Sequence, residues 1–140
     1  MDTLNASGMK LFSRGFGNFE MAQSKKATHE MFKKTADRRP DVVFVANDHM
    51  ALAVMDTLRF ELGLRVPEDV SVVGFDDVPA AGWLAYDLTT VRQPANRMVA
   101  DTVEILLDQI ENQQSEPRRI AIDGPLILRG SARIPEGWIT

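Results

Sequence analysis

The feature that most limits the folds open to this chain is a continuous apolar run, Val42–Ala46, directly after Asp41. A strand made only of apolar residues has no face suited to water, so it must be covered on both sides. Strands covered on both sides are typical of parallel sheets, because the crossover helices of such sheets pack on both faces. The run therefore predicts a buried strand in a layered α/β protein.

The residues after this run predict a parallel strand–helix–strand unit. Asn47 and Asp48 are both good helix N-caps, and Met50–Leu62 carries an apolar stripe at helical spacing. Gly63 stands where a glycine commonly ends a helix, and a second apolar run, Val70–Phe75, follows soon after. Two such strands joined by one helix form a βαβ unit.

Segments with strand-like and helix-like spacing of apolar residues also alternate on both sides of this unit. Helical spacing of apolar residues predicts further helices, and short runs rich in β-branched residues predict further strands. The predicted helices cover 20–36 and 96–112, and the predicted strands cover 10–13, 89–92, 119–122 and 126–128. The expected fold is an α/β protein with a mostly parallel sheet flanked by helices.

The helix predicted over Met50–Leu62 has more apolar surface than one sheet can cover. Besides its main stripe it carries Leu52, Ala53 and Phe60 on other faces. A helix that is apolar nearly all round must be buried nearly all round. The additional cover can come from a neighbouring helix of the chain or from a partner subunit in a symmetric dimer, and the pattern is compatible with both.

Composition excludes several classes of function. The chain has 140 residues, enough for one domain, and contains no cysteine, which rules out disulfides and thiolate metal sites. Its net charge of −4 makes it a poor candidate for binding DNA by itself, since phosphate neutralisation needs a basic surface. No apolar run approaches the roughly 20 residues that span a bilayer, and residues 1–10 lack the order of a secretory signal.

Catalytic and cofactor-binding motifs are missing from the sequence. Gly15 and Gly17 begin a dinucleotide-binding pattern, but Glu20 stands where its third glycine belongs. Asp76 and Asp77 could serve as an acid and a base, yet neighbours on an extended chain point to opposite sides. We therefore predict no enzyme activity, no catalytic residue, no cofactor and no metal.

Polar and aromatic residues follow the predicted strands where ligands bind in open parallel sheets, beyond the carboxyl ends. They are Phe19, Asn47 with Asp48, and Asp76 with Asp77. Carboxylates and amides pair with ligand hydroxyls, and an aromatic face covers a sugar or base ring. Each also has a structural explanation: a helix cap for Asn47 or Asp48, a turn for the aspartate pair, and the core for Phe19.

Several segments resemble the LacI/GalR family of transcriptional regulators. The resemblance runs from about residue 15 to about residue 133 and is most specific in the middle. The matching segments are Gly17–Phe19, Val45–Leu52, Gly63–Asp77, Leu88–Pro94 and Pro125–Arg133, of which Gly63–Asp77 matches almost residue for residue.

The resemblance implies a periplasmic-binding-protein-like fold of two lobes around a cleft, with residues 1–140 forming a partial effector-binding and dimerisation domain. The chain would be the C-terminal lobe, with a loose tail over 135–140. The effector would be a sugar or a nucleobase, with Phe19 stacking on it and Asn47 and Asp76 hydrogen-bonding to it. Such regulators are cytoplasmic and bind DNA through a helix-turn-helix, which this chain lacks together with most of the N-terminal lobe.

The family also dimerises, and the resemblance places Leu52, Met55 and Trp83 in the homodimer interface. Its members alter their DNA affinity when the effector binds. A periplasmic solute-binding protein of a sugar transporter is the alternative function, because it has the same architecture. The Gly63–Asp77 segment favours the regulator.

Overall fold

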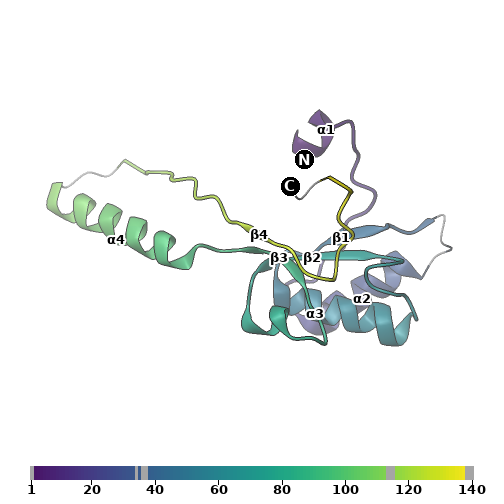
Figure 1. The fold of residues 1–140 in the computed structure, drawn as a ribbon. Helices are drawn as coiled ribbons and strands as arrows, with labels where there is room; N and C mark the ends of the chain where they lie inside the picture. The colour runs from purple at the N-terminus through teal and green to yellow at the C-terminus, as the bar shows by residue number, and fades with distance from the viewer. Residues whose placement is uncertain (1, 34, 36–37, 113–115, 138–140) are drawn as a thin grey trace.

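The computed structural model describes a four-stranded sheet with helices (Figure 1). The described residues are 2–33, 35, 38–112 and 116–137. The strands lie in the order β1 (Val42–Phe44), β2 (Ser71–Asp76), β3 (Thr89–Arg92) and β4 (Leu126–Ile127). The first three are parallel and β4 is antiparallel to β3, which confirms the mostly parallel sheet.

The three predicted helices form with shifted ends, and two short helical elements, at Asp2–Ala6 and Pro79–Gly82, were not predicted. The helical elements are α1 (Asp2–Ala6), α2 (Met21–Phe32), α3 (Asp48–Asp56), a π-helical turn η2 (Thr57–Glu61), a 3₁₀ turn η3 (Pro79–Gly82) and α4 (Ala95–Asn112). None of the described helices is long and apolar enough to cross a membrane.

Helix α3 forms the centre of the core and packs against both α2 and β2. Its residues Met50–Met55 are all buried, and Leu58 in the following turn is buried as well. The sequence allowed either a neighbouring helix or a partner subunit to cover the additional apolar surface of this helix. The neighbouring helix α2 accounts for much of this burial. Gly63, with φ +63°, takes the left-handed conformation expected of a residue that ends a helix.

Helix α4 projects away from the sheet and the other helices (Figure 1). Its apolar stripe is exposed along its length, at Val99, Val103, Leu106 and Ile110. Chain segments at its two ends connect it to the sheet at β3 and β4. An amphipathic helix with an uncovered apolar face is one that lacks its packing partner.

In the described part of the chain, two predicted strands do not form and one predicted helix is shorter. Residues 10–13 and 119–122 are not strands, because in the described part of the chain no strand pairs with them. Helix α2 ends at Phe32, and its first residue, Met21, is exposed. Residues 135–137 are exposed and irregular, while 138–140 lie outside the described residues, so the loose tail stays a prediction.

Ser131 ties the end of the chain to the sheet. This fully buried side chain donates to Val72 O at 2.6 Å and accepts from Thr89 N at 2.8 Å. We expect Ser131→Ala to lower the free energy of unfolding by about 2–3 kcal/mol, because it leaves two buried backbone groups without a partner. Urea denaturation measures this change, with exposed Ser13→Ala as the control; equal losses in the two variants would contradict the prediction.

Candidate functional site

The parallel sheet brings the predicted ligand-binding residues to one edge. Asn47 follows β1 and Asp76 ends β2, and parallel strands end at the same edge of a sheet. The turn containing Phe19 reaches this edge because Gly17 packs against the start of α3. A Cβ added at Gly17 would lie 2.7 Å from Met50 Sδ and 2.5 Å from Ser24 Oγ, so this contact requires glycine.

Phe19 is an exposed aromatic ring, which excludes the alternative that it belongs to the core. It is 76% exposed and has a positive φ of +60° in the turn before α2. A large apolar side chain held in the open in this way has a free face for a ring-shaped ligand.

Asn47 is the residue that caps α3. Its side-chain oxygen accepts a hydrogen bond from Met50 N at 2.9 Å, in the standard N-cap geometry. The structural explanation is therefore confirmed for Asn47, and the cap fixes the orientation of its side chain. The cap uses the carbonyl oxygen, which leaves the Nδ2 group as the one that can donate to a ligand.

Asp48 does not cap the helix but bonds to the sheet. Its fully buried carboxylate accepts from Thr90 Oγ1 at 2.7 Å and from Val78 N at 3.0 Å. Gly74 leaves the space that this carboxylate occupies. Asp48 thus fixes the start of α3 against β2 and β3 and is not available to a ligand.

The aspartate pair forms a turn with unusual backbone geometry. Asp76 has φ +124° and Asp77 has φ +60°, both in the region that favours glycine. The Asp76 carboxylate, which is partly exposed, contacts the side-chain amide of Gln93. Asp77 instead pairs with Arg129 and Arg92, so only Asp76 is left to meet a ligand.

The ion pairs of Asp77 make the free energy of unfolding depend on pH. Burial raises the pKa of Asp77, but the hydrogen bonds from Arg129 and Arg92 outweigh burial and hold the pKa below its ordinary value of 3.8. These pairs therefore stabilise the fold above pH 3.8, and the contribution is lost as the pH falls through the folded-state pKa. We expect Asp77→Asn to lose less stability than the wild type between about pH 5 and about pH 2, as measured by urea denaturation. Parallel pH curves for the two proteins would contradict this.

Sequence patterns did not predict which side chains contact Asp76 and Asp77. Gln93 directly follows β3 at the same edge, a position that could have marked it as a candidate. The pairing of Asp77 with Arg129 joins residues 52 positions apart, and no local pattern predicts such a contact.

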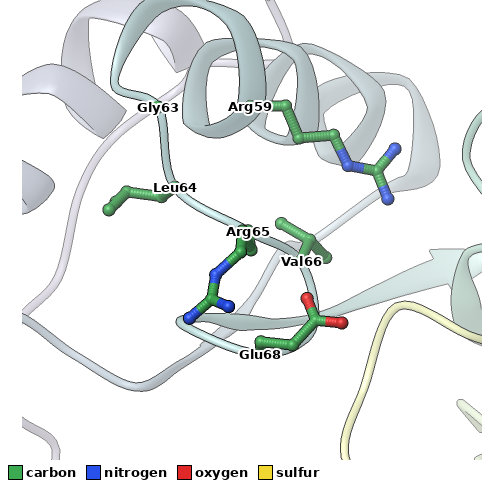
Figure 2. Close-up of a pocket in the computed structure, with 6 residues that line it drawn as sticks. All are labelled: Arg59, Gly63, Leu64, Arg65, Val66 and Glu68. Atoms are coloured by element: carbon green, nitrogen blue, oxygen red, sulfur yellow. The ribbon is translucent and has the colours of Figure 1, made fainter.

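Two of the hollows formed by the described residues bear on the position of the site. One of about 450 Å³ is lined by Arg59, Gly63–Val66 and Glu68, at the amino end of β2 and thus at the opposite edge (Figure 2). Its guanidinium groups point in different directions, and both are engaged: Arg59 with Ala85 O and Arg65 with Asp69. A second hollow of about 270 Å³ includes Phe75 and Gln93 and adjoins the candidate site.

The residues expected in a dimer interface differ in exposure. Leu52 is 8% exposed and Met55 is 0% exposed, since both pack within this chain's core. Trp83 is 60% exposed, and the adjacent Leu84 is almost entirely exposed. Within the described residues, no group of three His, Cys, Asp or Glu side chains could hold a metal ion.

Comparison with known proteins gives consistent matches. The model of the periplasmic binding protein-like domain family matches residues 11–132. The HTH-type transcriptional repressor PurR of Aliivibrio fischeri (strain MJ11) is 36% identical over 115 residues, which are 82% of this chain and 34% of that protein. This chain therefore spans about a third of the length of that relative.

Solved structures of regulators share the fold. The transcriptional regulator CelR in its cellobiose complex aligns with a TM-score of 0.81 and 34% identity, covering 94% of this chain and 40% of that one. The Lac repressor bound to ONPG in its repressed state aligns with a TM-score of 0.81 and 27% identity, covering 94% of this chain and 39% of that one.

Proposed function

Since the chain belongs to the periplasmic binding protein-like domain family, in the form found in LacI-type regulators, we propose that it is the effector-sensing and dimerising part of a transcriptional regulator. The relatives named above are transcriptional regulators, and this favours a regulator over a solute-binding protein of a transporter. Neither they nor the candidate site supports an enzyme. A regulator that acts on an operator works in the cytoplasm.

The observation that carries this proposal is the set of side chains at the carboxyl edge of the sheet. Phe19 offers an exposed ring, Asn47 an oriented amide and Asp76 a carboxylate in a fixed turn. Charged and amide groups bond to the hydroxyls of a sugar or the polar edge of a nucleobase, while the aromatic ring covers its flat face. We propose that these three residues bind the effector.

The uncovered helix α4 supports the assignment of this chain to the C-terminal lobe. Its exposed stripe of Val99, Val103, Leu106 and Ile110 needs a packing partner, and the part of this chain that matches the PurR relative is only 34% of that protein. We propose that an N-terminal lobe covers this stripe and closes the effector cleft. With a net charge of −4, the chain would contact DNA only through a helix-turn-helix outside it.

The dimer proposal rests on the exposed side chains near α3. Trp83 and Leu84 follow the 3₁₀ turn η3, and Phe60 in η2 is exposed as well. Leu52 and Met55 would contribute as the buried base of this surface, since they shape α3 from inside the core. Large aromatic side chains of this kind are common centres of interfaces.

The test uses the complete protein that contains this chain. Calorimetric titration with cellobiose, other neutral sugars and purine bases measures effector binding, and retention of genomic DNA fragments with and without the bound compound measures regulation. We expect one of these compounds to bind and to change DNA retention. A protein that binds a sugar but retains no DNA fragment would instead be a solute-binding protein, and the regulator proposal would fail.

A further inference from the structure

The turn that carries Asp76 is bonded to both places where the α4 segment joins the sheet. This segment leaves the sheet after β3, at Arg92 and Gln93, and returns at β4, just before Arg129 (Figure 1). Gln93 contacts the Asp76 carboxylate, while Arg92 and Arg129 both pair with Asp77. The two connections are also bonded to each other, from Arg92 N to Pro125 O at 2.9 Å.

Asp77 uses both of its carboxylate oxygens in this arrangement. Oδ1 accepts from Arg129 Nη2 at 2.7 Å and Oδ2 accepts from Arg92 Nε at 2.6 Å. The Asp77 side chain is only 6% exposed, and Arg129 is itself held by a bond from Nη1 to Leu88 O at 2.8 Å. Asp77 is therefore held between the anchored Arg129 and the half-exposed Arg92, and it cannot change its orientation without breaking an ion pair.

Two consecutive residues other than glycine with positive φ need support from their surroundings. Such a conformation is costly and persists only where other contacts impose it. Gln93 contacts one residue of this turn, Asp76, and the two ion pairs of Asp77 hold the other residue on both sides. If these pairs were lost, the turn could relax and the Asp76 carboxylate would move with it.

We infer that Asp77 is a positioning residue, which holds Asp76 in the orientation for effector binding and links that orientation to both connections of the α4 segment. This inference rests on the proposed function. Asp77 does not touch the effector; it acts through Asp76. Movement of the α4 segment would shift Arg92 and Arg129, and through Asp77 it would change the affinity of the site.

The experiment measures binding of cellobiose and of guanine to the complete protein by calorimetry, and continues with the probe that binds more tightly. We expect Asp77→Asn to weaken binding about tenfold, the scale typical of losing an outer-shell partner of a binding group. Asp69→Asn is the matched control, since Asp69 also accepts bonds from an arginine but lies in the Arg65–Asp69 loop at the opposite edge. It should leave the affinity unchanged.

A double variant separates positioning from a merely structural role. If Asp77 acts through Asp76, adding Asp77→Asn to Asp76→Gly causes no further loss of affinity, whereas independent effects would add. Unchanged affinity in the Asp77→Asn protein, or an additive loss in the double variant, would overturn the inference while leaving the effector site in place. Unchanged affinity in the Asp76→Gly protein would count against the proposed function itself.

Discussion

Gly74→Ala is expected to lower the free energy of unfolding by about 3–5 kcal/mol. An added Cβ would lie 2.2 Å from Asp48 Oδ1 and 3.0 Å from Leu88 Cδ2, and both side chains are fully buried. The clash must push away the oxygen that accepts from Thr90, so overpacking is combined with a broken buried hydrogen bond. A loss of this size is a large part of the stability of a typical domain.

Gly82→Ala is the matched control for this change. The atom nearest to a Cβ at Gly82 would be Arg129 Nη2 at 3.8 Å, which is an ordinary contact. We expect this variant to stay within about 0.5 kcal/mol of the wild type. Urea denaturation measures the free energy of unfolding of both variants. Equal values would show that Asp48 does not occupy the space at Gly74.

Removing the Asp76 carboxylate is expected to weaken effector binding by about 100-fold in the complete protein. A hydrogen bond to a charged group contributes about 1.5–3 kcal/mol, and about 2.7 kcal/mol corresponds to 100-fold in affinity. Asp76→Gly suits this test, because glycine accepts the φ of +124° without strain. Titration with the compound that binds the wild type measures the loss.

Two controls belong to the Asp76 variant. The thermal midpoint should stay at or above that of the wild type, since the strained backbone is relieved. Asp41→Asn, an exposed position at the start of β1 and thus at the other edge of the sheet, should leave the affinity unchanged. Wild-type affinity in the Asp76→Gly protein would mean that the effector binds elsewhere.

Periodicity predicted the core elements because their local pattern and their tertiary environment agree. The apolar runs at β1 and β2 became parallel strands, and β3 matches its predicted range of 89–92. The segment 10–13 failed because a strand needs a neighbour, and no pattern within the segment supplies one. Helix α4 was predicted correctly, but the apolar residues of its stripe remain exposed in the described part of the chain.

The candidate site could be predicted in position but not in detail. The rule that ligands bind beyond the carboxyl ends of strands located Asn47 and Asp76, since it needs only the strand ends. The rule does not distinguish the roles of two adjacent residues. Asn47 caps α3, whereas the buried Asp48 carboxylate accepts a hydrogen bond from Thr90 in the sheet. The ion pair of Asp77 with Arg129 depends on the fold as a whole, because it joins residues that lie 52 positions apart, just beyond β2 and β4.

The most direct test of the central claim is a crystal structure of the complete protein with its bound effector. We predict that the effector lies at the carboxyl edge of the sheet, with polar atoms about 3 Å from the Asp76 carboxylate and from Asn47 Nδ2, and with its ring against Phe19. An effector bound instead in the hollow between Arg59 and Glu68, at the opposite edge, would contradict the assignment of the site.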